Sequence, residues 1–339
     1  MSVLKLKKSL MLIGKLGIAT AVLWFLVHSA QIKPELFTHF FQQPLLSLSI
    51  ICILLGMIAI CAWRWQTLNT SQGIHLSFKE TLTATYLGAA FNYVLPGSVG
   101  GDVVRMYYVF KKNPQKKGSA MLAVFFDRVM GFIAVFITIS LVALLSMDTF
   151  RLQPKLFYLL SLCALFCFSV LAVFSLFLFL PEKIGLAEWL SRRFPANRWV
   201  KRLVSLLNAM SNFRLSKVVI LKCLFLSVLN QMMIVCTVLI IAKIMGLPVI
   251  SFVDYALAMG ITQIVNLIPL TPGGVGIGEM AFANILQLMN PGVIGAFATI
   301  FFTYRVISIV TYLPGIIYYI PRFVLLKQRT ELEETAAQA

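Results

Sequence analysis

Five ionisable side chains lie in otherwise apolar sequence: Asp102, Asp127, Arg128, Glu279 and Arg305. A charged group at the centre of a membrane helix costs about 2.5 to 3.5 kcal/mol, so such groups are expected to face a bundle interior and to be paired. Two interpretations stay open. Arg128 and Arg305 neutralise Glu279 and Asp102 and lock the two halves of the chain together. Alternatively, the arginines exchange between those carboxylates and a lipid phosphate, which a guanidinium fork suits.

Two related stretches contain most of these charges. Residues 91–105 read FNYVLPGSVGGDVVR, and residues 266–279 read NLIPLTPGGVGIGE. Proline removes a backbone donor and glycine tolerates unusual backbone angles, so each apolar segment is expected to break at its Pro-Gly step. The candidate residues for substrate binding or gating are Asn92, Pro96, Gly97, Gly100, Gly101, Asp102, Arg105, Asp127, Arg128, Asn266, Pro272, Gly273, Gly274, Gly276, Glu279 and Arg305.

The glycine loops have two interpretations of their own. They present backbone N–H groups to an anion at the start of a half-helix, or they allow close helix packing. Asn92 and Asn266 either hydrogen-bond carbonyls freed by the break or contact the substrate. The first loop, PGSVGG, matches neither nucleotide-binding glycine pattern, so it indicates no nucleotide.

Composition indicates a multi-span membrane protein, because the chain is 60% hydrophobic and only 12% charged. Its net charge of +17 comes from basic residues in short loops, which favours anionic lipid as the partner and not nucleic acid. The six cysteines lie in apolar runs and are expected to serve packing, and the three histidines are scattered. We therefore expect no metal site and no cofactor.

Six apolar runs are long enough to cross a bilayer, at about 9–29, 44–63, 119–146, 155–180, 217–245 and 292–318. The two Pro-Gly segments, about 79–110 and 252–290, are left over. The predicted fold class is an all-α polytopic membrane protein, with about six transmembrane helices plus two re-entrant broken helical hairpins. With both hairpins re-entrant, the loop charges obey the positive-inside rule and predict a cell inner membrane protein with both termini cytoplasmic, Arg64 being counted as a cytoplasmic loop charge.

Other segments lie around this core. Residues 181–216 predict an amphipathic helix on the inner leaflet, or a linker helix packed on the bundle. Residues 1–330 form one expected domain, and 331–339 are a disordered acidic tail.

The two halves, about 44–146 and 217–318, repeat one another. Gly73 pairs with Gly246, and the spacing of 173 residues rises to 177 at Arg128 and Arg305. Three complete predicted spans lie between the two broken segments, so the copies enter from opposite sides. This is an inverted repeat, an arrangement that secondary transporters use for alternating access.

Three linked motifs resemble a known family: N-x-x-L-P-G-x-x-G-G-D-x-x-R at 92–105, F-D-R-x-x-G at 126–131 and P-G-G-V-G-x-G-E at 272–279. They are similar to the transmembrane region of lysylphosphatidylglycerol synthases and related stand-alone flippase-like proteins. The resemblance spans about 10–320 and implies movement or binding of a lipid. It argues against lysyl transfer by this chain alone, because no synthase domain follows the last span. Ser98 departs from the more usual glycine.

The expected function is a lipid translocase that moves a phospholipid, an aminoacyl lipid or a polyprenyl-phosphate-linked lipid between leaflets without ATP. Three alternatives remain. The chain is a membrane-embedded enzyme that uses Asp102 or Asp127 as a base, a partner subunit of a separately encoded lipid-modifying enzyme, or a small-solute transporter.

Overall fold

The described part of the chain is helical. The structure is a computed structural model that describes residues 33–94, 100–145, 186–193, 216–248, 250–268, 271, 274–293 and 295–315, with single positions elsewhere. No strand occurs among these residues. Four of their helices are long and apolar enough to cross a membrane: α3 (Pro44–Ser71), Pro114–Val142, which overlaps α6 (Lys117–Leu145), α11 (Lys217–Ile244) and the Phe297–Gly315 helix. The prediction of an all-α polytopic membrane protein is confirmed.

Several predicted segments lie outside the described residues, either wholly or apart from single positions. These are the spans at 9–29 and 155–180 and the tail at 331–339. Within the predicted amphipathic segment, α9 (Leu186–Arg193) is helical and carries exposed Trp189 beside Arg192 and Arg193. The short elements η1 (Pro34–Phe37) and α2 (Thr38–Gln42) precede α3, and η2 (Pro114–Lys116) precedes α6.

The first Pro-Gly segment folds as a helical hairpin of α4 (Phe78–Val94) and α5 (Gly100–Lys112). Its open end is joined by an ion pair between Glu80 and Lys112. At its tip, the Gly101 N–H donates to Asn92 Oδ1 over 2.8 Å. These contacts pair the start of one helix with the end of the other, so α4 and α5 are antiparallel. Pro96 and Gly97, in the turn, lie outside the described residues.

The second Pro-Gly segment has the same construction, from α12 (Phe252–Val265) and α13 (Ile277–Met289). Asn290 Nδ2 donates to Asp254 Oδ2 over 3.3 Å at the open end. Serine begins the first helix of both hairpins, since Ser251 Oγ accepts the Asp254 N–H and Ser77 Oγ accepts the Glu80 N–H. Pro272 and Gly273 lie outside the described residues.

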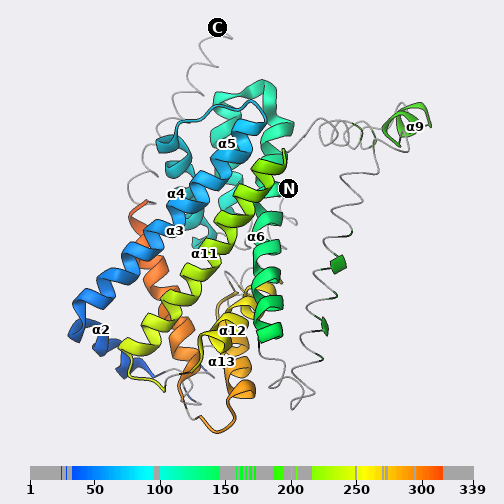
Figure 1. Cartoon of the computed structure of the whole chain (residues 1–339). Helices are drawn as coiled ribbons and strands as arrows, with labels where there is room; N and C mark the ends of the chain where they lie inside the picture. Colours follow the sequence, from blue (N-terminus) through cyan, green and yellow to red (C-terminus); the bar gives the residue numbers. More distant parts are fainter. Residues whose placement is uncertain are drawn as a thin grey trace, which may run out of the picture.

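The two hairpins belong to halves that are inverted relative to each other. Helices α3 and α11 have 28 residues each and occupy corresponding places in the repeat, 173 residues apart. They lie side by side in Figure 1, and Arg64 near the end of α3 contacts Ser227 in the first half of α11. Cys61, one turn earlier in α3, contacts Asn230, one turn later in α11, so the two helices run antiparallel. Equivalent helices that pack antiparallel are related by a two-fold axis across the bundle, the geometry of an inverted repeat.

Helix α6 brings the halves together, because it packs on α3 and α5 from the first half and on α11 and α12 from the second. Figure 1 shows the hairpin α4–α5 in the upper part of the molecule and α12–α13 in the lower part. The largest apolar cluster joins α3, α11, α12, α13 and the Phe297–Gly315 helix. Polar side chains from both halves line the space beside α6.

One sequence interpretation is wrong. Helix α3 continues to Ser71, well beyond the predicted end at residue 63, so Arg64 is a buried helical residue and not a loop charge. The apolar pattern weakens after residue 63, but Gly73 follows the true end of the helix with a φ of 67°, as helix-terminating glycines do.

Candidate functional site

A cavity of about 400 Å³ lies between the two halves. It is lined by residues from α3, α4, α5, α6, α11 and α12, with contributions from the second hairpin tip and the last helix. Its polar and glycine lining consists of Cys61, Arg64, Thr85, Gly88, Asn92, Gly101, Asp102, Arg105, Asp127, Arg128, Gly131, Ser227, Asn230, Gln231, Gln263, Asn266 and Tyr312.

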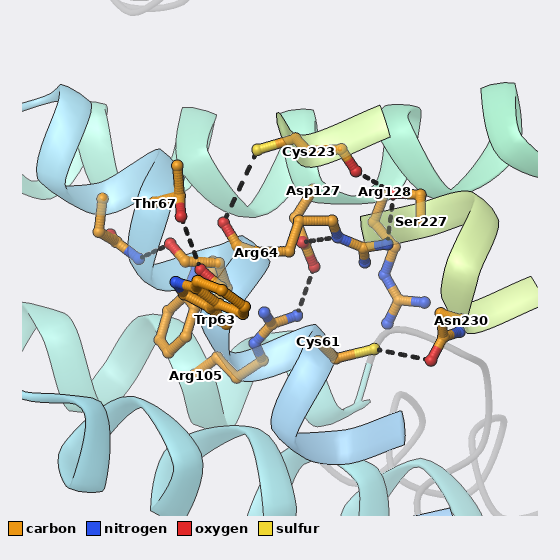
Figure 2. Close-up of polar contacts among 12 residues, drawn as sticks. Cys61, Trp63, Arg64, Thr67, Arg105, Asp127, Arg128, Cys223, Ser227 and Asn230 are labelled. Atoms are coloured by element: carbon orange, nitrogen blue, oxygen red, sulfur yellow. Dashed lines mark hydrogen bonds and ion pairs between the residues drawn. The ribbon is translucent and has the colours of Figure 1, made fainter. Parts of the chain in front are cut away.

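Asp127 forms the fixed centre of the cavity wall. Arg64 Nε donates to Asp127 Oδ1 over 2.7 Å, and Arg105 Nη1 donates to Asp127 Oδ2 over 2.9 Å. Figure 2 shows the carboxylate between the two guanidinium groups. Because both its oxygens are engaged, Asp127 holds α3, α5 and α6 together.

Two further contacts fix the arginines around Asp127. Arg64 Nη1 donates to Ser227 Oγ over 2.8 Å and so reaches α11 in the other half. The Arg105 guanidinium carbon lies 4.3 Å from the centre of the Trp65 ring, a cation–π distance. The clamp that Arg64 and Arg105 form on Asp127 is therefore anchored in both halves of the molecule.

The first-half ion pair opens on the cavity. Arg128 Nε donates to Asp102 Oδ2 over 2.8 Å, and Arg105 Nη1 lies 3.6 Å from Asp102 Oδ1. The Arg128 side chain is 40% exposed, whereas that of Asp102 is 8% exposed. In Figure 2 the Arg128 guanidinium extends toward the Asn230 side of the cluster. Arg128 thus has the most exposed side chain of the three arginines in this cluster.

The second-half ion pair is sealed. Arg305 Nε donates to Glu279 Oε1 over 2.7 Å, with side-chain exposures of 6% and 0%. The loop wraps around this pair: the Gly276 N–H donates to Glu279 Oε2 over 2.7 Å, and Arg305 Nη2 donates to the Gly274 carbonyl over 3.0 Å. Gly274 and Gly276 have φ angles of 72° and 84°, which glycine adopts without steric cost. Neither ionic side chain lines the cavity.

Several buried polar atoms of the cavity wall have no hydrogen-bond partner within the described part of the chain. The donors among them are Nε and Nη2 of Arg105 and Nε2 of Gln231. The acceptors include Asp102 Oδ1 and Asn266 Oδ1. Buried polar groups are normally hydrogen-bonded. Each of these atoms has almost no accessible surface, so a ligand in the cavity would reach them only if the wall rearranged.

The structure brings together seven of the residues predicted from sequence. Asn92, Gly101, Asp102, Arg105, Asp127, Arg128 and Asn266 all line the cavity. Glu279, Arg305, Gly274 and Gly276 form the sealed pair and its loop, while Gly100 is buried in the first turn of α5. In both copies the carboxylate and its arginine are partners within one half, 26 residues apart. The interpretation that these pairs lock the two halves together is therefore wrong.

Sequence reasoning missed several polar members of the cavity wall, including Thr85. Arg64 was placed in a loop, and Ser227, Gln263 and Tyr312 have no local motif. Asn230 and Gln231 of α11 also line the cavity. Among the described residues, no group of three or more histidine, cysteine or acidic side chains is placed to hold a metal ion.

The comparison with protein families gives one match. The family described as the lysylphosphatidylglycerol synthase TM region matches residues 12–315, which is most of the chain. The chain belongs to this family. Searches of curated proteins and of solved structures gave no match. Membership of the lysylphosphatidylglycerol synthase TM family, together with the apolar helices, supports a membrane location and a relation to lipid-modifying proteins.

The cavity gives a physical reading of the F-D-R-x-x-G motif in this member of the lysylphosphatidylglycerol synthase TM family. Phe126 is fully buried in the apolar core and orients α6. Asp127 is clamped by two arginines, and Arg128 faces the open cavity. Gly131 lies one turn beyond Arg128 and lines the same space. The motif thus combines one packing residue with three cavity residues.

Proposed function

We propose that this chain is a lipid translocase, which moves a phosphate-bearing lipid between the two leaflets without ATP. The observation that carries the proposal is the open ion pair: Arg128 faces a cavity of about 400 Å³ while its partner Asp102 stays buried. In this account Arg128 exchanges between Asp102 and the phosphate of the head group. The lipid is a phospholipid or a polyprenyl-phosphate-linked lipid.

The charge of the cavity wall supports an anionic ligand. Among the described residues, Arg64, Arg105 and Arg128 line it together with two carboxylates, Asp102 and Asp127. An excess guanidinium at membrane depth costs about 2.5 to 3.5 kcal/mol, and a bound anion offsets that cost. Phosphate matches the planar guanidinium fork and accepts two parallel hydrogen bonds from it.

The unpartnered donors support the same ligand. Nε and Nη2 of Arg105 and Nε2 of Gln231 are buried and have no acceptor in the described part of the chain. All three donors belong to residues that line the cavity with Arg128. A phosphate carries several acceptor oxygens, so one head group can satisfy donors from both halves once the halves move and expose these buried atoms.

The inverted arrangement supplies a route. A site between two inverted halves is closed from each leaflet by a different hairpin, so small movements of the halves expose it to one leaflet at a time. Here α4–α5 and α12–α13 are the two hairpins, and they contribute Asn92 and Asn266 to the cavity. In this account both termini lie in the cytoplasm and the protein resides in a cell inner membrane.

The test is lipid flipping in proteoliposomes with fluorescent phosphatidylglycerol and an outer-leaflet quencher. Arg128→Ala is expected to slow flipping about 10- to 100-fold, the value of one or two hydrogen bonds to a charged group. Arg128→Lys keeps the positive charge but not the guanidinium fork, so its flipping rate is expected to lie between those of wild type and Arg128→Ala. Arg192→Ala, on exposed α9, is the matched control and is expected to flip at the wild-type rate.

Two results contradict the proposal. If Arg128→Ala flips lipid at the wild-type rate, the ion pair is not the substrate site. If lipid extracted after incubation is chemically altered, the chain is a membrane-embedded enzyme. Asp127 is poorly arranged as a base for such an enzyme, because both its oxygens already accept hydrogen bonds from arginines.

A further inference from the structure

Gly131 marks open space next to the exposed arginine. It lies on α6 three residues after Arg128, and positions three apart on a helix share one face. Both residues line the cavity. A Cβ atom placed on Gly131 meets no atom within 4 Å, so the space extends directly from the α6 backbone into the cavity.

Other glycines at the cavity have a different role. A Cβ atom on Gly101 would lie 2.1 Å from the Gly88 carbonyl oxygen, and one on Gly88 would lie 2.9 Å from the Gly101 oxygen. These two glycines let α4 and α5 pack closely. Gly131 touches no neighbour in this way, so close helix packing does not explain it.

The corresponding position in the second half is filled. Ser308 lies 177 residues after Gly131, as Arg305 lies after Arg128, and it is fully buried with its hydroxyl donating to the Tyr304 carbonyl. The sealed ion pair thus has a packed side chain one turn away, and the open pair has a void. The void therefore belongs to the half with the exposed arginine.

We infer that the space beside Gly131 receives the part of the head group attached to the phosphate, and that Gly131 sets the largest head group that the site accepts. This inference rests on the proposed function and narrows its substrate class. A volume of about 400 Å³ is near the lower end of the roughly 300–1,000 Å³ of small-molecule pockets. It suits a phosphate with a small alcohol better than one with an oligosaccharide, so the substrate is a phospholipid with a small head group.

The experiment uses three phospholipids with the same acyl chains and one negative charge each: phosphatidylmethanol, phosphatidylglycerol and phosphatidylinositol. Binding to the full-length protein in detergent is measured by competition with fluorescent phosphatidylglycerol, and flipping is measured in proteoliposomes. The variants are Gly131→Ala and Gly131→Leu. Gly292→Leu is the matched control, since a Cβ atom there also meets nothing within 4 Å but the residue lies in an exposed turn outside the cavity.

Wild type is expected to bind phosphatidylmethanol and phosphatidylglycerol better than phosphatidylinositol. Gly131→Leu is expected to bind phosphatidylmethanol with wild-type affinity. Its affinity for phosphatidylglycerol should fall about 10- to 100-fold, the usual penalty for a misfit of one or two carbon atoms in a pocket. Gly131→Ala should also lower the ratio of phosphatidylglycerol to phosphatidylmethanol binding, but by a smaller factor. Gly292→Leu should match wild type for all three lipids.

The inference is overturned if Gly131→Leu binds phosphatidylglycerol and phosphatidylmethanol in the wild-type ratio, or if it binds neither lipid. If Gly131→Leu lowers the Tm, the same ratio in Gly131→Ala decides. Graded binding without any flipping by wild type would contradict the translocase proposal and leave the size limit standing. Flipping by wild type with an unchanged binding ratio in both variants would contradict only the size limit.

Discussion

The two ion pairs have the same construction and opposite surroundings. In each half an arginine Nε donates to a carboxylate 26 residues earlier, over 2.8 Å in the first half and 2.7 Å in the second. Arg128 is 40% exposed to a cavity, whereas Arg305 is 6% exposed and enclosed by its own loop. The repeat therefore preserves the pair as part of the fold, and its surroundings decide whether a ligand can reach it.

The surroundings differ at three corresponding positions. Where the first half has Arg64, Arg105 and Asp127, the second has Thr237, Phe282 and Tyr304. Phe282 is fully buried and packs against Tyr255 and Phe301. Uncharged side chains, two of them aromatic, thus stand where the first half has Arg64, Arg105 and Asp127. In the proposed function, the first half therefore supplies the ligand-binding charges and the second half does not.

The largest expected effect concerns the orientation of the halves. Asn113 follows α5, and Gly292 follows α13 at the equivalent end of the second hairpin. Single cysteines at these positions, in a variant without reactive native cysteines, should be labelled by a membrane-impermeant thiol reagent from opposite sides of intact vesicles. The positive-inside rule places residue 113 in the cytoplasm. Labelling of both from one side would contradict the inverted arrangement.

The next effect concerns stability and separates the two pairs. Arg305→Ala leaves Glu279 buried without its partner, which costs about 3 to 5 kcal/mol, and a large fall in Tm is expected in detergent. Arg128→Ala should lower the Tm less, because the Asp102 left behind lines a cavity that water can enter and still lies 3.6 Å from Arg105 Nη1. Equal losses of Tm in the two variants would show that both ion pairs are structural. They would contradict the contrast between an exposed first-half pair and a sealed second-half pair.

Glycine substitutions give a smaller contrast between the hairpins. Gly101→Ala forces a methyl group against backbone atoms of Gly88, 2.1 and 2.6 Å away, and overpacking of this kind costs about 1 to 3 kcal/mol. Gly278→Ala meets only side-chain atoms of Asn266, Arg305 and Phe301, at 2.8 Å or more. The Tm of Gly101→Ala should therefore be the lower of the two. The reverse order would contradict the close packing of α4 on α5.

The smallest expected effect concerns the two asparagines. Asn92 Oδ1 accepts the Gly101 N–H over 2.8 Å, whereas Asn266 Oδ1 is buried without a donor in the described part of the chain. Asn92→Ala should lower the free energy of unfolding by about 1 kcal/mol more than Asn266→Ala. Asn266→Ala should instead weaken lipid binding, since Asn266 lines the cavity from the second half. Equal effects on unfolding would contradict this division.

The sequence predicted the features that recur in both halves. Hydropathy located α3, α6, α11 and the last helix, and the Pro-Gly steps located both hairpins, because broken apolar runs have a local signal. Buried charge identified Asp102 and Arg128, since such residues are costly in a membrane unless they are paired or functional.

The contrast between the halves was not predictable in this way. Exposure of Arg128 and burial of Arg305 depend on packing between helices that are distant in sequence. Arg64 was misplaced because Trp63 and Trp65 beside it are typical of a membrane interface. Its contacts with Asp127 and Ser227, 63 and 163 residues away, leave no local pattern in the chain.

The central claim is that a lipid phosphate binds at the open pair and not at the sealed one. An experimental structure of the full chain in nanodiscs containing phosphatidylglycerol tests it directly. We predict phosphate density within hydrogen-bond distance of the Arg128 guanidinium, with Arg105 or Gln231 donating from the same cavity wall. Density at Arg305, or a cavity filled only by acyl chains with Arg128 still paired to Asp102, would contradict the account.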